Sequence, residues 1–429
     1  MSSWRESTSK IILLDNGSYE IKNSKPSLKK NYKFHNAKFL DKSTGNSISS
    51  STPFFIQDIS KDYPIENISS IGHNFTRPLS RGLLGDIDLQ LDIWDKIFSQ
   101  NYGLNKDEEN IKNSLLIFTY TPMAPDDVME GFFEMIFEYF NFDACIKSIP
   151  HIFTALYNKK KYPDKINKTV QLVIDSGFSS TTIVPIFNNK PVYNAIKRVE
   201  ISGKLMTNYL KECLSNTLDL DIRKEFFLAN LIKEEMCFFS QDFEKDMKLA
   251  KDGDTYIKNF ILPEYRRKPP TFFENENNSK FIIKLNNLRF IVPELLFNPN
   301  IIGIEAGGIH EGVLSSISEC HKDYKDLLYQ NIITNGGITK LPGFNQRLCH
   351  ELSSSVDYSF VNGVQIFGEE KNTNNVYEEP VIEGMKLFAL DNEVIKDLAI
   401  TRNDYDEIGF NIVWKTCLRY NIIKYFLYI

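Results

Sequence analysis

One stretch of the sequence decides the fold: Ile11-Ile12-Leu13-Leu14-Asp15-Asn16-Gly17-Ser18. Its four leading apolar residues predict a buried β-strand. Asp15-Asn16-Gly17 then predicts a tight turn, in which Asn-Gly supplies a positive φ angle. Residues 19–22 alternate between larger uncharged and charged side chains, which predicts a strand that returns beside the first. The stretch therefore predicts a β-hairpin with a carboxylate at the entry of its turn.

The same pattern occurs a second time, much further along the chain. Leu172-Val173-Ile174 predicts a buried strand, Asp175-Ser176-Gly177 a turn, and Thr181-Thr182-Ile183-Val184 a returning strand. A single hairpin of this kind is common in proteins. Two of them at a domain-length separation predict an internal duplication.

Two such hairpins facing each other can hold a polyphosphate. Consecutive backbone N–H groups in each turn form a nest that suits phosphate oxygens. Asp15 and Asp175 cannot touch phosphate directly because like charges repel, so we expect a hydrated Mg²⁺ between these carboxylates and the phosphate oxygens. Lys22, on the first returning strand, is placed to reach back to the phosphates. A solvated surface lysine is the alternative interpretation of Lys22.

The composition excludes several classes of protein. The 429 residues include 50 Lys and Arg against 56 Asp and Glu, and a net charge of −6 excludes a strongly basic nucleic-acid binder. The polar residues 1–9 predict no secretory signal, and no apolar run reaches the roughly 18 residues of a membrane helix. Six cysteines without a C-x-x-C pair favour reduced thiols in a cytosolic or nuclear protein over a disulfide framework or a zinc site.

The intervening segments predict one compact, bilobed molecule. Helical periodicity predicts helices over residues 88–98 and 125–140. The Lys-rich segment 157–168 contains Pro163 and predicts a linker before the second hairpin. Further polar stretches predict surface loops at residues 43–53, 269–280 and 369–379.

Two further motifs are weaker by themselves. Asn335-Gly336-Gly337 follows an apolar pair and allows a close backbone approach to a flat ligand such as adenine, although a plain tight turn explains it equally well. Lys233-Glu234 lies in a predicted helix and can be read as an ordinary charged face. The usual P-loop is missing, because Gly203-Lys204 is followed by Leu205 and lacks the upstream glycine. A Rossmann fingerprint, an H-E-x-x-H zinc motif and a hydrolase triad are also missing.

Taken in order, these motifs resemble the two phosphate loops and the adenosine loop of the actin superfamily, and Ile400-Thr401-Arg402 resembles a segment near its C-terminal end. The resemblance runs from about residue 11 to residue 418 and is strongest to a nuclear class of actin-related proteins. It implies an α/β, actin-like, duplicated two-lobe fold, with ribonuclease-H-like cores and four subdomains around a nucleotide cleft. The first lobe would comprise residues 1–165 and 375–429, with subdomain 2 at about 37–74. The second would comprise residues 166–374, with subdomain 4 at about 202–289.

The resemblance also implies a site for ATP or ADP with Mg. Its nucleotide-binding residues would be Asp15, Asn16, Gly17, Ser18, Lys22, Asp175, Ser176, Gly177, Gly203, Lys233, Glu234, Gly336 and Gly337. Asp15 and Asp175 would hold the Mg²⁺ through water.

Several positions depart from the pattern of the family. Tyr19 replaces a glycine and narrows the first loop, while Phe178 and Ser179 replace an acidic residue and a glycine in the second. The water-orienting glutamine of the family aligns with Glu134, and a histidine of the same water network aligns with Thr182. Losing these groups predicts nucleotide binding with slow or absent hydrolysis, because this chemistry depends on positioned water and electrostatics. Glu134 acting as a base is the alternative.

The resemblance implies a non-catalytic scaffold subunit of an SWR-type chromatin-remodelling complex, which exchanges a variant histone into nucleosomes. We expect it to pair with a HIT-type zinc-finger subunit and the remodelling ATPase assembly, and to meet nucleosomes and histones indirectly. We expect no membrane association, no homopolymer, and a location in the nucleus with some in the cytoplasm. An ATPase, small-molecule kinase or chaperone of the same fold, or a filament-forming actin, are the alternatives.

Overall fold

The computed structural model describes residues 10–39, 75–103, 109–217, 222–223, 225–263, 281–355, 363–368 and 378–412. Almost all of the predicted subdomain 2 (about 37–74) lies outside these residues. So do the predicted loops at 43–53 and 269–280 and most of the one at 369–379.

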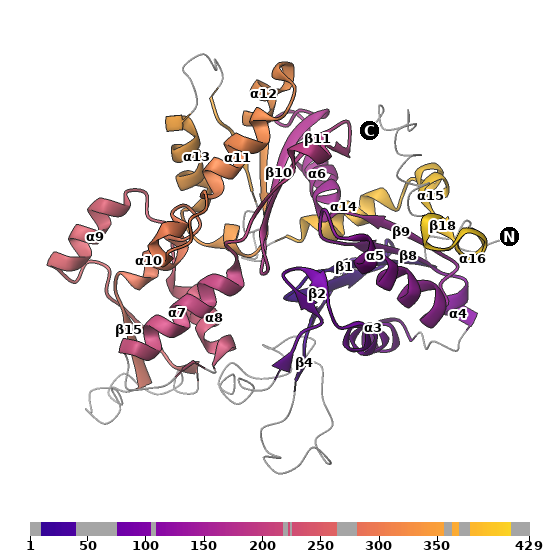
Figure 1. The fold of residues 1–429 in the computed structure, drawn as a ribbon, viewed down its shortest axis with the longest axis horizontal. Helices are drawn as coiled ribbons and strands as arrows, with labels where there is room; N and C mark the ends of the chain where they lie inside the picture. Colours follow the sequence, from indigo (N-terminus) through magenta and orange to yellow (C-terminus); the bar gives the residue numbers. More distant parts are fainter. Residues whose placement is uncertain are drawn as a thin grey trace, which may run out of the picture.

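A six-stranded sheet forms the centre of the first lobe (Figure 1). Its strand order is β18-β9-β8-β1-β2-β3. The strands are β1 (Ile11–Asn16), β2 (Glu20–Ser24), β3 (Tyr32–His35), β8 (Leu115–Thr119), β9 (Ala144–Ser148) and β18 (Ile400–Thr401). Strand β1 pairs antiparallel with β2 and parallel with β8. The hairpin predicted from the opening stretch is therefore confirmed.

The second lobe repeats this arrangement. Its strand order is β12-β11-β10-β16-β17, with β13 beside β11. The strands are β10 (Val170–Ser176), β11 (Thr181–Phe187), β12 (Lys190–Pro191), β13 (Lys197–Val199), β16 (Ile332–Asn335) and β17 (Ile366–Phe367). Strand β10 pairs antiparallel with β11 and parallel with β16, as β1 does with β2 and β8. The predicted duplicated fold is confirmed, whereas the exact lobe boundaries stay a prediction.

Helices cover both faces of the first sheet, which explains why β1 is a continuous apolar run rather than an alternating one. Ile12 and Leu14 pack with Trp94 of α3, whereas Ile11 and Leu13 pack with Phe153 on the opposite face. The helical segments of this lobe are α3 (Ile87–Tyr102), α4 (Glu109–Lys112), α5 (Asp126–Phe133), the π-helical η5 (Glu134–Tyr139), α6 (Pro150–Lys161), α14 (Pro380–Phe388), α15 (Asn392–Leu398), α16 (Arg402–Ile408) and the 3₁₀ turn η12 (Gly409–Asn411).

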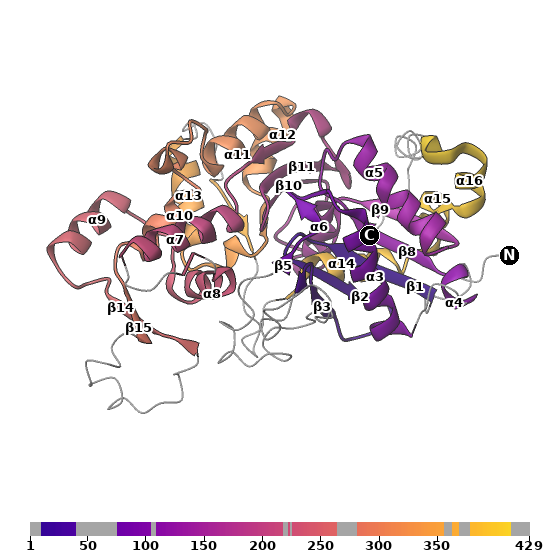
Figure 2. The same cartoon turned by 60° about the horizontal axis from the view of Figure 1, so that its bottom comes forward.

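The second lobe carries its own set of helices, and both views show it beside the first lobe (Figures 1 and 2). Its helical segments are η6 (Tyr193–Ala195), α7 (Gly203–Thr217), α8 (Phe226–Met236), α9 (Phe243–Asp252), α10 (Leu288–Glu294), η10 (Pro299–Ile302), α11 (Ile309–Ser318), α12 (Lys322–Tyr329), η11 (Ile338–Lys340) and α13 (Phe344–Ser355). The short strands are β14 (Lys258–Ile261) and β15 (Ile282–Leu285) here, and β4 (Lys38–Phe39), β5 (Phe75–Thr76), β6 (Leu79–Ser80) and β7 (Leu83–Leu84) in the first lobe.

The predicted linker at 157–168 is wrong over its first part, because α6 continues to Lys161. This helix is a central element: Phe153 packs into the core of the first lobe, and Ala155 packs with Val173 of the second sheet. Its three terminal lysines are compatible with helix because a helix C-terminus carries partial negative charge. The helix predicted over 125–140 is confirmed as helical from Asp126 to Tyr139, although α5 changes to π-helical η5 after Phe133.

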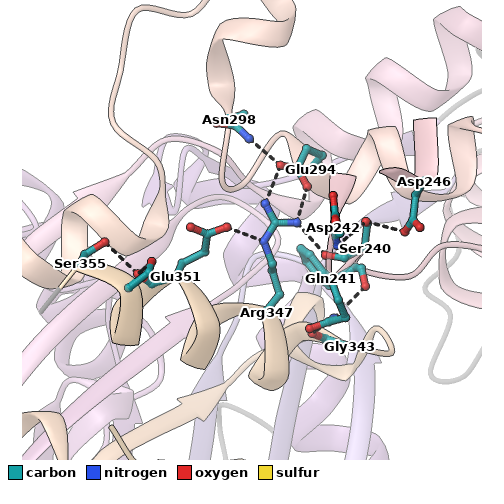
Figure 3. A network of polar contacts seen from close by, with 12 residues as sticks. Ser240, Gln241, Asp242, Asp246, Glu294, Asn298, Gly343, Arg347, Glu351 and Ser355 are labelled. Carbon is teal, nitrogen blue, oxygen red and sulfur yellow. Dashed lines mark hydrogen bonds and ion pairs between the residues drawn. The ribbon is translucent and has the colours of Figure 1, made fainter. Parts of the chain in front are cut away.

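A buried ion pair ties α13 to α10 within the second lobe (Figure 3). The Arg347 guanidinium donates two hydrogen bonds to the Glu294 carboxylate, at 2.9 and 3.1 Å, and one to Ser240 O at 2.6 Å. Its Nε donates to Glu351 at 2.7 Å. Glu294 has no solvent exposure, and burial raises the pKa of its carboxyl, an effect that the Arg347 charge opposes.

Replacing this arginine tests how strongly the pair holds the lobe together. We expect Arg347→Ala to lower the free energy of unfolding by about 3–5 kcal/mol, because it leaves the Glu294 charge buried and uncompensated. Urea unfolding of the purified chain measures this loss. Lys197→Ala is the matched control, since Lys197 pairs with Glu319 at the surface of the same lobe and should change the value by about 1 kcal/mol or less. Equal losses in the two variants would contradict the prediction.

Candidate functional site

The two Asp-x-Gly turns face one cavity between the lobes. The turns follow β1 and β10, and the cavity has a volume of about 250 Å³. All the sequence-predicted binding residues except Ser176 line it: Asp15, Asn16, Gly17, Ser18, Lys22, Asp175, Gly177, Gly203, Lys233, Glu234, Gly336 and Gly337. Ser176 is fully buried behind the second turn, where its Oγ lies 2.8 Å from Thr181 Oγ1.

Equivalent neighbours hold the two aspartates. Thr119 Oγ1, at the end of β8, donates to Asp15 Oδ1 at 2.7 Å. Asn335 Nδ2, at the end of β16, donates to Asp175 Oδ1 at 3.3 Å. Each donor ends the strand that runs parallel to the one carrying its aspartate. The sequence analysis did not mention Thr119 and used Asn335 only as the first residue of a glycine turn, with no role for its side chain. The parallel pairing of duplicated strands is the signal that points to both.

Burial controls the protonation of these carboxyls. Burial raises the pKa of Asp15, the nearby Lys22 ammonium opposes this effect, and the Asp175 charge adds to it. Burial likewise raises the pKa of Asp175, against the charges of Lys22 and Lys340. A cation between the two would relieve their repulsion. Within the described ranges, no group of three or more His, Cys, Asp or Glu side chains is placed to bind a metal by itself, so an ion here would keep much of its water.

Lys22 lies opposite Asp15 in the β1–β2 register, but its ammonium group is bound to a carboxylate that the sequence analysis missed. Lys22 Nζ lies 2.6 Å from Glu379 Oε2, and Lys33 Nζ lies 2.5 Å from Glu379 Oε1. Burial opposes ionisation of Glu379, yet Lys22, Lys340 and Lys33 together lower its pKa to about 2. A phosphate that binds Lys22 must therefore compete with a buried, ionised carboxylate.

Glycine is required at two of the turns because of close approach. A Cβ on Gly336, whose φ is +104°, would lie 2.3 Å from Ser176 O. A Cβ on Gly17 would lie 2.5 Å from Glu20 O. The positive φ predicted for the Asn16-Gly17 pair is wrong, since neither residue is among the described residues with positive φ. The Asn16-Gly17 turn needs glycine because a Cβ at position 17 would clash with Glu20 O, and not because of a left-handed conformation.

Lys233 and Glu234 line the cavity from α8, but Lys233 is already satisfied within the protein. Its ammonium group donates to Gly203 O at 3.2 Å, Thr207 Oγ1 at 2.8 Å and Asn230 Oδ1 at 2.8 Å. These three bonds fix the start of α7 against α8. Glu234 accepts from Asn230 Nδ2 at 2.7 Å, and burial raises the pKa of its carboxyl.

The structure corrects the assignment of Glu134. This residue begins η5, is exposed to solvent and does not line the cavity. The next three residues of η5 are buried in the core of the first lobe, whereas the Glu134 side chain faces solvent, so its carboxylate is not placed to orient water in the cavity. Pro150, at the start of α6, lines the cavity instead.

A histidine that the sequence analysis passed over lies directly behind the cavity wall. His151 Nε2 is 2.9 Å from the hydroxyl of Thr182, which lines the cavity and lies opposite Asp175 in the β10–β11 register. Burial lowers the pKa of His151 to about 4, so its imidazole is neutral at pH 7. The position predicted to have lost a histidine therefore contacts one from another element. Pro150 marks a helix start and is the sequence signal that places His151 in the first turn.

The duplicated sheets and the shared cavity define a two-lobed protein of the actin type. A family model described as Actin matches residues 57–418, so the chain belongs to the actin family. It is 32% identical over 363 residues to actin-related protein 6 of Arabidopsis thaliana, covering 78% of this chain and 83% of that protein. It is 29% identical over 418 residues to the actin-like protein ARP6 of Yarrowia lipolytica, covering 95% and 96%.

A protein of Dictyostelium discoideum, also named actin-related protein 6, is 29% identical over 412 residues, covering 78% of this chain and 81% of that protein. The resemblance to this particular class of actin-related proteins, inferred from the sequence motifs, is confirmed. Among the described residues, no helix combines the length and the apolar character that crossing a membrane requires.

Replacing Glu379 tests whether this carboxylate competes with phosphate for Lys22. We expect Glu379→Gln to lower the free energy of unfolding of the ligand-free protein by about 2 kcal/mol, because two ammonium groups lose their shared carboxylate. Because the folded-state pKa is depressed, this contribution is present at neutral pH and is lost as the pH falls from about 4.5 towards 2. Thermal melting with and without Mg-ATP should show a larger nucleotide-induced stabilisation in the variant than in the wild type.

Glu378→Gln is the matched control for this experiment. Glu378 is the neighbouring residue, pairs with Lys161 at 2.7 Å and does not line the cavity. We expect a small change in melting temperature and an unchanged response to Mg-ATP. A Glu379→Gln variant that responds to Mg-ATP no more than this control would refute competition for Lys22.

Proposed function

We propose that the protein is a non-catalytic, actin-related scaffold subunit that holds ATP or ADP with Mg between its lobes. The observation that carries this proposal is the composition of the cavity. It keeps both Asp-x-Gly turns and both aspartates, whereas none of the described residues lining it is a Gln or His. Both turns are present, and the glutamine and histidine of the family's water network have no counterpart among these lining residues.

The residues fit a nucleotide with Mg²⁺. The protein environment raises the pKa of Asp15 and of Asp175, and a cation beside them would offset this cost of ionisation. The turns offer backbone N–H groups, and the missing Cβ of Gly336 lets its turn pack closely against Ser176 O and Asp175. Bound Mg²⁺ would neutralise phosphate charge. The chain's own contribution is to hold both lobes on one ligand, which stabilises the closed arrangement by differential affinity.

We further propose that the protein works in an SWR-type remodelling complex that exchanges a variant histone into nucleosomes. The supporting argument is the similarity to proteins named actin-related protein 6. In this proposal it pairs with a HIT-type zinc-finger subunit and the remodelling ATPase assembly in the nucleus, with some protein in the cytoplasm. Nucleosomes and histones are met indirectly, because a chain with a net charge of −6 leaves DNA affinity to other subunits. It does not form a homopolymer.

An actin-fold ATPase is the second candidate, and His151 is the observation that favours it. A neutral imidazole 2.9 Å from Thr182 Oγ1 could polarise this hydroxyl towards a water in the cavity. Burial of the histidine behind the wall argues against direct contact with water.

Nucleotide turnover separates the two candidates. We expect the purified chain to bind Mg-ATP, seen as an increase in melting temperature, and to release phosphate no faster than a buffer blank. The scaffold has positioned phosphate contacts without a positioned nucleophile, which explains both results. Steady-state phosphate release that His151→Ala abolishes would instead establish the ATPase.

Affinity purification tests the assembly. A tagged copy of the chain, expressed in cells of the organism it comes from, should recover a HIT-type zinc-finger protein and remodelling ATPase subunits, identified by mass spectrometry. Nucleosomal proteins recovered with them should be lost after nuclease treatment and a salt wash, because contact with chromatin is indirect. Recovery of cytoskeletal proteins alone would contradict the proposal.

A further inference from the structure

An aromatic cluster spans the two lobes beside the cavity. We call it the interlobe latch, and it consists of Tyr19, His35, Phe75 and Arg77 from the first lobe with Phe178, Phe226, Phe227 and Asn230 from the second. Tyr19 and Phe178 are two of the three substitutions in the turns that depart from the family pattern, the third being Ser179. Their meeting across the lobes could not be read from either turn alone.

Ring contacts in the latch join one lobe to the other. Tyr19 lies 5.1 Å from Phe178 and 6.4 Å from Phe227, measured between ring centroids. Phe75 lies 5.1 Å from Phe227 and 5.8 Å from Phe226. These separations fall in the attractive range for aromatic pairs. The latch is therefore a continuous apolar contact between the first turn, β5, the second turn and α8.

Arg77 lies within the latch and contacts rings from both lobes. Its guanidinium carbon lies 4.9 Å from the ring of Tyr19 and 4.8 Å from the ring of Phe178, so one cation serves both lobes. The same group donates to Ser18 O and Tyr19 O, each at 3.1 Å, which fixes the first turn. Burial lowers the pKa of Arg77 to about 10, so the charge remains at neutral pH. Desolvated cation–π contacts are stronger than exposed ones.

Two hydrogen bonds also join the lobes. Asn230 Nδ2 of α8 donates to the Tyr19 hydroxyl at 3.3 Å. Arg198 Nη2 of β13 donates to Arg81 O, in the β6–β7 turn, at 2.8 Å. Both bonds run between the lobes, and each would break if the lobes separated.

We propose that the interlobe latch keeps the lobes closed without nucleotide and gates nucleotide entry and release. This inference rests on the proposed function, since it regulates the same cavity. Tyr19 and Phe178 line that cavity, whose volume of about 250 Å³ lies below the roughly 300–1,000 Å³ of most ligand sites. A nucleotide enters or leaves when the two rings part. The scaffold keeps its shape whether or not the cavity is filled.

Nucleotide release from the full-length chain tests the gate. Phe178→Ala removes the ring contacts with Tyr19 and Phe226 and the cation–π contact with Arg77. We expect release of a fluorescent ATP analogue, chased with excess Mg-ATP, to accelerate about tenfold. Phe178→Tyr keeps the ring and should release as slowly as the wild type. Tyr324→Ala is the matched control, because Tyr324 pairs with Phe187 at 4.6 Å within the second lobe. It should leave the release rate unchanged.

Hydrogen exchange of the nucleotide-free protein tests the latch independently of binding. Amides of residues 15–20 and 175–180 should exchange faster in Phe178→Ala, and should keep their wild-type rates in Tyr324→Ala. A wild-type chain that binds no nucleotide would end the proposed nucleotide role, yet this measurement would still decide whether the lobes are latched. Exchange at both turns that is unchanged in Phe178→Ala overturns the latch. Faster exchange with unchanged nucleotide release overturns the gate.

Discussion

The structure depends on one electrostatic constraint: Asp15 and Asp175 lie near the ends of equivalent strands and bring two carboxylates into the same cavity. Neighbouring residues stabilise the two carboxylates. Thr119 and Asn335 each donate a hydrogen bond to one of them, and the Lys22 ammonium favours ionisation of both. The two carboxylates still repel each other, and a hydrated cation beside them would relieve that repulsion.

Without a ligand, contacts within the chain neutralise the lysines of the cavity and hold the lobes together. Glu379 pairs with Lys22 and Lys33, so the lysines are neutralised without phosphate. The interlobe latch supplies closure through apolar contact. Ordinary closure of two lobes on a ligand takes its energy from the ligand's higher affinity for the closed form. Here the closed form has contacts of its own, because Tyr19, Phe178 and Arg77 meet between the lobes.

Much of the site could be predicted because the duplication repeats in sequence. Strand, Asp-x-Gly turn and returning strand are local patterns, and the apolar runs of β1 and β10 reflect sheets covered on both faces. The errors arose where local patterns were ambiguous. A lysine-rich segment reads as a linker, yet residues 157–161 complete α6, which packs against both sheets. Glu134 was matched by its neighbouring residues, and its position on η5 turns it to solvent.

The sequence by itself determined the two hairpins, the residues of their turns, and the neighbouring Lys233 and Glu234 of α8. Only the tertiary structure decided which distant side chains meet. His151 reaches Thr182, Glu379 reaches Lys22, and Tyr19 reaches Phe178 across segments with no local relation. The physical reason is that strands and turns follow from local patterns along the chain. Compensation of buried charge and closure of two lobes depend instead on how the elements pack.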